Sequence, residues 1–197
     1  MLLVSLYQKL LNASRYVDGI APLALRIYLA PVLLQAGYNK LLHFDDTVAW
    51  FANPDWGLGL PMPALLAGLA AGTEFLGAIL LLLGLATRLI SIPLMVTMLV
   101  AAFTVHWPNG WLAIADGSSW LANDRVLEAG DKLAKAKDIL QEQANYQWLT
   151  SSGNFVVLNN GIEFAITYFI MLLALFTLGG GRYTSLDYVI ARHFGVK

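Results

Sequence analysis

The sequence predicts an all-α integral membrane protein, a four-helix bundle with one long insertion outside the membrane. Its 197 residues are 58% hydrophobic and only 13% charged, whereas an average soluble domain is about 25% charged. The mean hydropathy of +0.62 agrees with this prediction. Four apolar stretches each approach the ~20 residues that cross a bilayer core. They cover residues 20–44, 63–86, 89–107 and 161–180.

The composition also excludes several classes of protein. A net charge of −1 gives no electrostatic footprint for nucleic acid. The chain has no cysteine, which excludes thiol catalysis, disulfides, iron–sulfur clusters and cysteine-ligated zinc. It also carries no motif for binding flavin. We expect a single membrane domain over residues 1–197, with the lipid bilayer as its main surroundings.

Basic residues predict the orientation of this domain, because short cytoplasmic segments are rich in lysine and arginine. The connection over residues 45–62 has no basic residue, whereas both ends of the chain and the second-to-third connection do. The residues concerned are Lys9, Arg15, Arg88, Arg182, Arg192 and Lys197. We therefore expect both termini in the cytoplasm. Residues 1–17 lack the pattern of a secretory signal and predict an amphipathic helix on the membrane surface.

The outer insertion, residues 108–160, carries a helical pattern of its own. Over residues 124–144 apolar side chains recur at steps of three and four, with charges between them, which predicts an amphipathic helix. Such a helix would lie on the outer leaflet, dock over the bundle or bind a partner. All six tryptophans fall in or beside the two outer connections. They form either an interfacial aromatic belt or a cap over the mouth of the bundle.

Three ionisable residues within the predicted spans are candidate catalytic residues, because charge at bilayer depth is costly and usually functional. Glu74 falls near the bilayer midplane, on a stripe of small residues that typically marks a helix–helix contact. Arg26 and Lys40, on the first helix, are both within reach of it. The alternative is a buried ion pair that fixes helix register, with Lys40 extending outward instead. The sequence leaves open which cation Glu74 meets.

A second group of candidates is predicted at the outer ends of the helices. His43, Met62 and His106 are acceptable copper ligands, although nothing in the sequence has local ligand spacing, and Glu163 is expected at the same level. The alternatives are a solvated interfacial His106 and a Glu163 that reaches back to an Asn160 cap.

At the inner end, three glycines at 179–181 should stop the fourth helix. Residues 184–187, Thr-Ser-Leu-Asp, then predict the cap of another short helix.

The pattern resembles the DoxX family of small four-helix membrane proteins. The resemblance rests on Ala-Gly-Tyr-Asn-Lys-Leu at 36–41, Glu-Phe-Leu-Gly at 74–77 with Gly-Leu-Ala-Thr-Arg at 84–88, and the closing residues 181–187. It implies a membrane subunit of a redox system in the bacterial inner membrane. One branch of the family is associated with thiosulfate:quinone oxidoreductase, and another with a complex containing sulfurtransferase and superoxide dismutase.

The insertion is similar to that of the HvfX-type subgroup, through residues 106–116, 148–154 and 158–163. That subgroup is named for gene clusters that make copper-binding, post-translationally modified peptides. The resemblance implies maturation, export or redox support of such a peptide.

The first functional hypothesis is quinone-linked redox support. Lys40 or Arg26 would donate a hydrogen bond to a quinone carbonyl, and Glu74 would pass protons. Tyr38 and Phe75 would stack on the ring, and Glu163 and His106 would offer further polar contacts at the outer end.

The second hypothesis is a non-catalytic binding module. Its outer insertion would dock a periplasmic protein or a modified copper peptide, and the membrane charges would only lock the bundle. A monomeric transporter is disfavoured, because only Pro31 and Pro93 offer candidate helix breaks and four helices leave little lumen. A transport path formed by an oligomer stays open. The residues alone define neither a reaction nor an oligomeric state.

Overall fold

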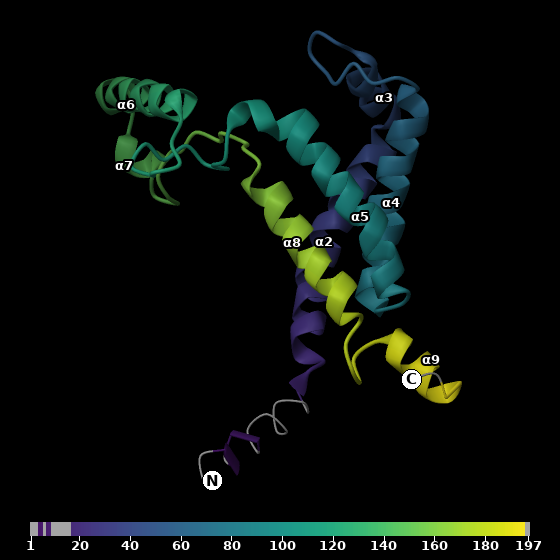
Figure 1. Cartoon of the computed structure of the whole chain (residues 1–197). Helices are drawn as coiled ribbons and strands as arrows, with labels where there is room; N and C mark the ends of the chain where they lie inside the picture. Colours follow the sequence, from purple (N-terminus) through teal and green to yellow (C-terminus); the bar gives the residue numbers. More distant parts are fainter. Residues whose placement is uncertain (1–3, 6, 9–16, 196–197) are drawn as a thin grey trace. The chain divides into compact units, whose positions relative to one another are not determined.

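The computed structural model describes residues 4, 5, 7, 8 and 17–195, and over these residues the chain is helical without a β-strand (Figure 1). Most of the surface helix predicted for residues 1–17 lies outside the described residues. The chain divides into two compact units. The first contains residues 1–98 with 168–197, and the second contains residues 99–167.

The predicted spans correspond to helices. α2 (Ile20–Leu42), α4 (Pro63–Leu83) and the helical run Thr87–Asn109 are each long and apolar enough to cross a membrane. The fourth stretch forms α8 (Glu163–Leu178), which is apolar but only 16 residues long. At a rise of 1.5 Å per residue, α8 measures about 24 Å, against a bilayer core of about 30 Å. Three helices of the described chain are therefore long and apolar enough to cross a membrane, and a bundle of four spans stays a prediction.

Helix ends follow from local backbone chemistry. α2 ends at Leu42, and after His43 the chain continues as α3 (Phe44–Ala52). α4 starts with a proline in its first turn, where no N–H is missed, and ends before Gly84, whose φ of +65° suits a residue without a side chain. This glycine explains why the second span stops short of the predicted residue 86. The short helix predicted after the three glycines is α9 (Leu186–His193), capped by Ser185.

The break in the third span is not at a proline. α2 runs through Pro31, and α5 (Thr87–Val100) runs through Pro93. The helical run changes instead at Ala101–His106, which is a π-helix, and then at Trp107–Asn109, which is a 3-10 helix. A π-helical turn needs no proline and is often found at functional positions, so the proline-based prediction of breaks was wrong.

The core of the first unit is aliphatic and draws on four helices. It consists of Leu29, Leu33, Ala78, Leu81, Leu94, Met98, Leu172 and Leu175. Large apolar side chains also cover the outside of these helices; Leu76 is 60% and Leu89 72% exposed. Side chains of this kind suit contact with lipid rather than water.

α2 and α4 lie side by side in this unit (Figure 1). Their backbones come closest at Gly37, where an added Cβ would lie 2.5 Å from the amide nitrogen of Phe75. Small residues allow such close packing between membrane helices. α3 packs on the opposite end of α4, toward its N-terminus, and buries Phe51.

In the second unit, two extended segments hold each other through backbone hydrogen bonds. The amide of Ala115 donates to Val157 (2.9 Å), that of Asn159 to Ala113 (2.9 Å) and that of Gly161 to Leu112 (3.0 Å). The side chain of Asn159 is buried, donates to the carbonyls of Asn109 and Leu112, and accepts from Arg125. Through Arg125, this asparagine connects the two segments to the helix α6 (Asp124–Gln143).

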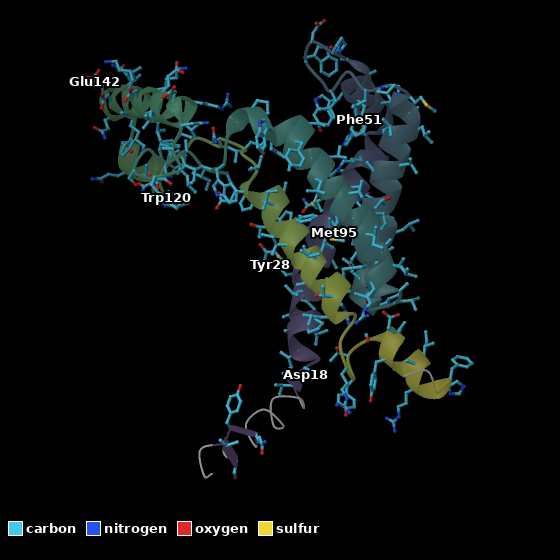
Figure 2. All side chains as sticks on the ribbon, in the orientation of Figure 1. Asp18, Tyr28, Phe51, Met95, Trp120 and Glu142 are labelled. Carbon is cyan, nitrogen blue, oxygen red and sulfur yellow. The ribbon has the colours of Figure 1, made fainter. Side chains whose placement is uncertain are left out.

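α6 (Asp124–Gln143) confirms the helix predicted over residues 124–144. The side chain of Asn123 caps it by accepting from the amide of Val126, which is itself buried. Charged side chains, among them Glu142, extend from its other faces (Figure 2). α7 (Tyr146–Leu149) is a single turn capped by Asn145.

The close approach of α2 and α4 makes a stability prediction. Gly37→Ala places a methyl group against the backbone of Phe75, and we expect it to lower the free energy of unfolding by about 1–3 kcal/mol. Gly72→Ala on α4 is the matched control, because an added Cβ there meets nothing within 4 Å. We expect the control to be neutral or stabilising by up to about 1 kcal/mol. Thermal unfolding of both variants in detergent micelles measures the difference; equal effects would contradict the contact.

Candidate functional site

An ion pair lies between α2 and α4. Nζ of Lys40 donates to Oε2 of Glu74 at 2.6 Å, and the side chain of Glu74 is only 7% exposed, against 27% for Lys40. The sequence left open whether Glu74 meets Arg26 or Lys40; its partner is Lys40. The other ion pair in the described part of the chain, Glu128 with Lys132 on α6, joins two exposed side chains.

The sequence puts Glu74 on the inner face of α4 by helical spacing. Its buried neighbours on that face are small or aliphatic: Ala67, Ala71, Gly77, Ala78 and Leu81. Gly37 lies one turn before Lys40 and packs against Phe75, next to Glu74. The glycine therefore brings the two helix backbones close enough for the ammonium and the carboxylate to meet. Glu74 points into the unit, as its stripe of small residues predicted.

The surroundings of the pair differ on its two sides. Phe75 is partly buried beside Gly37, whereas Tyr38 is 53% exposed. The ammonium group of Lys40 has three donors, and one of them goes to Glu74. The arrangement can hold a proton on a buried carboxylate and can offer hydrogen-bond donors on its more open side.

Arg26 is engaged elsewhere, at the other end of α4. Its side chain is buried and donates only to backbone carbonyls in the bonds described. Nε donates to Leu81 (2.8 Å), Nη2 to Leu82 (3.2 Å) and Thr184 (3.1 Å), and Nη1 to Gly180. These carbonyls belong to the last turn of α4 and to the turn after α8. Arg26 thus satisfies helix-end acceptors that would otherwise be buried without partners.

Asp187 accepts hydrogen bonds from the free backbone amides at the start of α5. Its carboxylate accepts from the amides of Ala86 (2.6 Å) and Thr87 (2.9 Å), and its own amide donates to Gly84 (2.9 Å). Its negative charge is also stabilised there by the positive end of the helix dipole. Arg26 and Asp187 together join the α4–α5 turn to the α8–α9 turn, and we call these two turns with the two side chains the polar junction.

The remaining predicted residues lie in both units. His43 ends α2, and Met62, 66% exposed with a φ of 53°, precedes α4; both belong to the first unit. His106 belongs to the second, where Nδ1 lies 2.9 Å from the carbonyl of Asn160. The shared level of these three residues therefore stays a prediction. Within the described residues, no group of three or more His, Cys, Asp or Glu side chains could hold a metal ion.

Glu163 does not make the predicted contact with an Asn160 cap. It is the first residue of α8, and its Oε2 accepts from the amide of Ala113 at 2.9 Å. Asn160 has a φ of +59°, and its carbonyl accepts from Asn109. The capping prediction was wrong because the chain before α8 pairs with residues 110–115 rather than winding into the helix.

Sequence reasoning missed the polar junction. One signal was available: a tight turn between two helices leaves carbonyls of the first and amides of the second without partners. Those groups require an acceptor and a donor from elsewhere in the chain. That they are Asp187 and Arg26 follows only from the fold, because these residues are far from the turn in sequence.

Comparison with known proteins finds similarity over part of the chain. Residues 21–107 match the DoxX family. The DoxX match contains α2 to α5, the Lys40–Glu74 pair and the π-helix, and it ends before the insertion and α8. Inner membrane protein YphA of Escherichia coli (strain K12) is 36% identical over 83 residues, which cover 40% of this chain and 56% of YphA. The chain thus spans just over half of this relative's length. No solved structure matches the chain.

A stability measurement can test whether Arg26 has the structural role of binding helix-end carbonyls. We expect Arg26→Gln to lower the free energy of unfolding by at least about 3 kcal/mol, because several buried carbonyls lose their donor. Arg192→Gln, at an exposed position on α9, is the control and should change it by less than about 0.5 kcal/mol. Denaturant titration in micelles measures both. An Arg26→Gln protein of unchanged stability would contradict the structural role.

Proposed function

We propose that the chain is a DoxX-type subunit of the bacterial inner membrane that gives quinone-linked redox support. In this proposal it spans the membrane four times with both termini in the cytoplasm. The system it serves would mature a copper-binding modified peptide, as in the HvfX-type subgroup, or would be a related periplasmic redox system. The observation that carries the proposal is the Lys40–Glu74 ion pair, buried between two apolar helices of the segment that matches DoxX.

The chemistry of the pair supports a redox role over a purely structural one. Lys40 is partly exposed and keeps donors beyond the one given to Glu74. A buried ion pair adds little net stability compared with apolar residues of the same size, so packing alone gives no reason to place one here. The two side chains combine a hydrogen-bond donor with a carboxyl group that can pass a proton. A quinone carbonyl accepts such a hydrogen bond and takes up a proton when it is reduced.

The donor set fits a quinone. When bound, a quinone would supply the exchange of two electrons with two protons. Lys40 would orient its carbonyl through a hydrogen bond, and Glu74 would hold the proton at Oε1, the carboxylate oxygen that does not accept from Lys40. Tyr38 and Phe75 would stack on the ring. Arg26 would contribute by fixing the end of α4 rather than by touching the quinone.

Copper is the second cofactor we propose, with His43 and Met62 as candidate ligands in the first unit and His106 as a candidate ligand in the second. Imidazole and thioether are suitable ligands for copper. In His106 the contact of Nδ1 with the carbonyl of Asn160 would make Nδ1 the protonated nitrogen and leave Nε2 for a metal. Glu163, in the same unit as His106, would offer its second carboxylate oxygen, for which no contact is described.

Quinone binding tests the main proposal. We expect Glu74→Gln and Lys40→Met each to reduce the quinone extracted per mole of purified protein about tenfold, because each removes a charge-assisted hydrogen bond. Saturation binding of a short-chain ubiquinone in micelles gives a second measurement. Glu128→Gln and Lys132→Met break the exposed ion pair of α6 and should leave both readings unchanged.

A further variant separates binding from folding. Breaking a buried pair from one side leaves an isolated charge, whereas Lys40→Met/Glu74→Leu removes both charges and should unfold near the parent temperature. This double variant should still fail to retain quinone. If it folds and retains quinone, or if the two single variants do so, the redox site is wrong.

The second candidate function is a docking module. Trp120 is 91% and Trp148 72% exposed in the second unit, and α6 presents charges on most of its surface (Figure 2). Exposed tryptophan is common at interaction sites, since it supplies large contact area at little entropic cost. In this alternative the insertion would hold a periplasmic protein or the modified peptide.

Deleting residues 124–143 distinguishes the two functions. If docking is the function, the deletion should abolish growth support in copper-stressed cells, while Glu74→Gln should only lower the unfolding temperature. If redox support is the function, Glu74→Gln should abolish it in a protein that is still inserted and folded. Membrane fractionation and thermal unfolding of each variant provide the controls.

A further inference from the structure

A cavity of about 270 Å³ lies beside the polar junction, in the first unit. It is lined by Ala86, Arg88, Leu89, Gly179, Gly180 and Asp187. The proposed redox site does not use it. Its walls come from the α4–α5 turn, from the residues that follow α8 and from the first turn of α9, where four helices of an apolar unit begin or end. Helix ends of this kind lie at the level of lipid headgroups.

Arg88 and Asp187 put opposite charges on this cavity without forming an ion pair with each other. Arg88 is exposed and gives one hydrogen bond to the carbonyl of Thr177 (3.0 Å), which leaves most of its donors free of described partners. Asp187 uses its carboxylate for the two amides of the α5 terminus, yet a carboxylate has about four acceptor positions. The cavity thus offers a cationic donor and an anionic acceptor with space between them.

The wall between the two charges is made of glycine. Gly179 has a φ of +80°, and an added Cβ would lie 3.2 Å from Nε of Arg88. At Gly180 an added Cβ would lie 2.7 Å from Oγ1 of Thr87. That hydroxyl is the buried side-chain oxygen for which the described part of the chain provides no hydrogen-bond partner. A side chain at either position would collide with these neighbours, so the close packing of this wall requires glycine.

The rim of the cavity is apolar on its outer side. Leu89, a lining residue, is 72% exposed, and Leu178 at the end of α8 is 55% exposed. In a membrane-embedded protein such side chains face acyl chains. A soluble ion would leave this surface uncovered, whereas a phospholipid would cover it with its tails while its headgroup entered the cavity.

We propose that this cavity binds the headgroup of an aminophospholipid. Arg88 binds the phosphate, and Asp187 accepts a hydrogen bond from the primary ammonium group. The opposite charges of the headgroup match those of the cavity. A choline headgroup has no N–H to donate to Asp187, and a glycerol headgroup has no positive charge. The site therefore prefers phosphatidylethanolamine to both. This inference is independent of the redox proposal.

Lipid retention tests the site. The full-length protein is equilibrated with micelles containing equal amounts of phosphatidylethanolamine, phosphatidylcholine and phosphatidylglycerol, and bound lipid is counted by native mass spectrometry. We expect at least a threefold preference for phosphatidylethanolamine. Arg88→Gln should lower its retention about tenfold, because the phosphate loses a charged donor. Arg192→Gln, which removes an exposed arginine of α9 away from the lining residues, should leave retention unchanged.

The role of Asp187 is read from selectivity rather than from total binding. Asp187→Asn keeps an acceptor for the α5 terminus but loses its charge, and it should abolish the preference for ethanolamine over glycerol headgroups. Thermal unfolding checks that this variant folds. Competition with inorganic phosphate distinguishes the source of the ligand: displacement at millimolar phosphate would show a soluble anion site and overturn the proposal. Equal retention of all three lipids, or equal losses in Arg88→Gln and Arg192→Gln, would overturn it as well.

Discussion

The guanidinium group of Arg26 is the interaction on which the first unit depends. It reaches carbonyl groups at the end of α4 and in the turn that follows α8, so one side chain fixes two parts of the chain that lie far apart in sequence. Backbone groups of helix ends that are buried within the protein have no water to satisfy them. Asp187 meets the same requirement from the opposite direction by accepting from the amides of α5. With both ends fixed, the relative heights of α2 and α4 are set.

Those heights matter for the second polar feature, the ion pair of Lys40 with Glu74. A shift of one helix by a single turn would carry the ammonium group about 5 Å away from the carboxylate. Gly37 keeps the two backbones close at the same level. The first unit is therefore organised as a rigid frame with two polar contacts, one that closes the helix ends and one that lies within the apolar interior. At the helix ends, Arg26 and Asp187 bind backbone groups. In the interior, the ammonium group of Lys40 keeps donors beyond the one given to Glu74.

Hydropathy and helical spacing were sufficient to predict the membrane helices, the inward position of Glu74 and the helix α6, because each depends on residues near one another in the chain. The partner of Glu74 was narrowed only to Arg26 or Lys40, since both long side chains lie on nearly one face of α2 and can reach its depth. Arg26 was predicted to act at the site, but it binds carbonyls of distant turns, and such contacts exist only once the fold is formed. The contact of Glu163 with Ala113 was not predicted for the same reason. It depends on the pairing of residues 110–115 with 157–161, which no pattern of neighbouring residues indicates.

The π-helix at Ala101–His106 has a consequence for how the chain can change in evolution. A π-helical turn accommodates one more residue than an α-helical turn before the next hydrogen bond closes. A helix that already contains such a turn tolerates the gain or loss of a residue there by switching between the two forms, without disturbing the helix on either side. The segment that matches DoxX ends one residue after this turn. A change in the length of the segment that follows could therefore be absorbed at this turn, and the helices before it would keep their register.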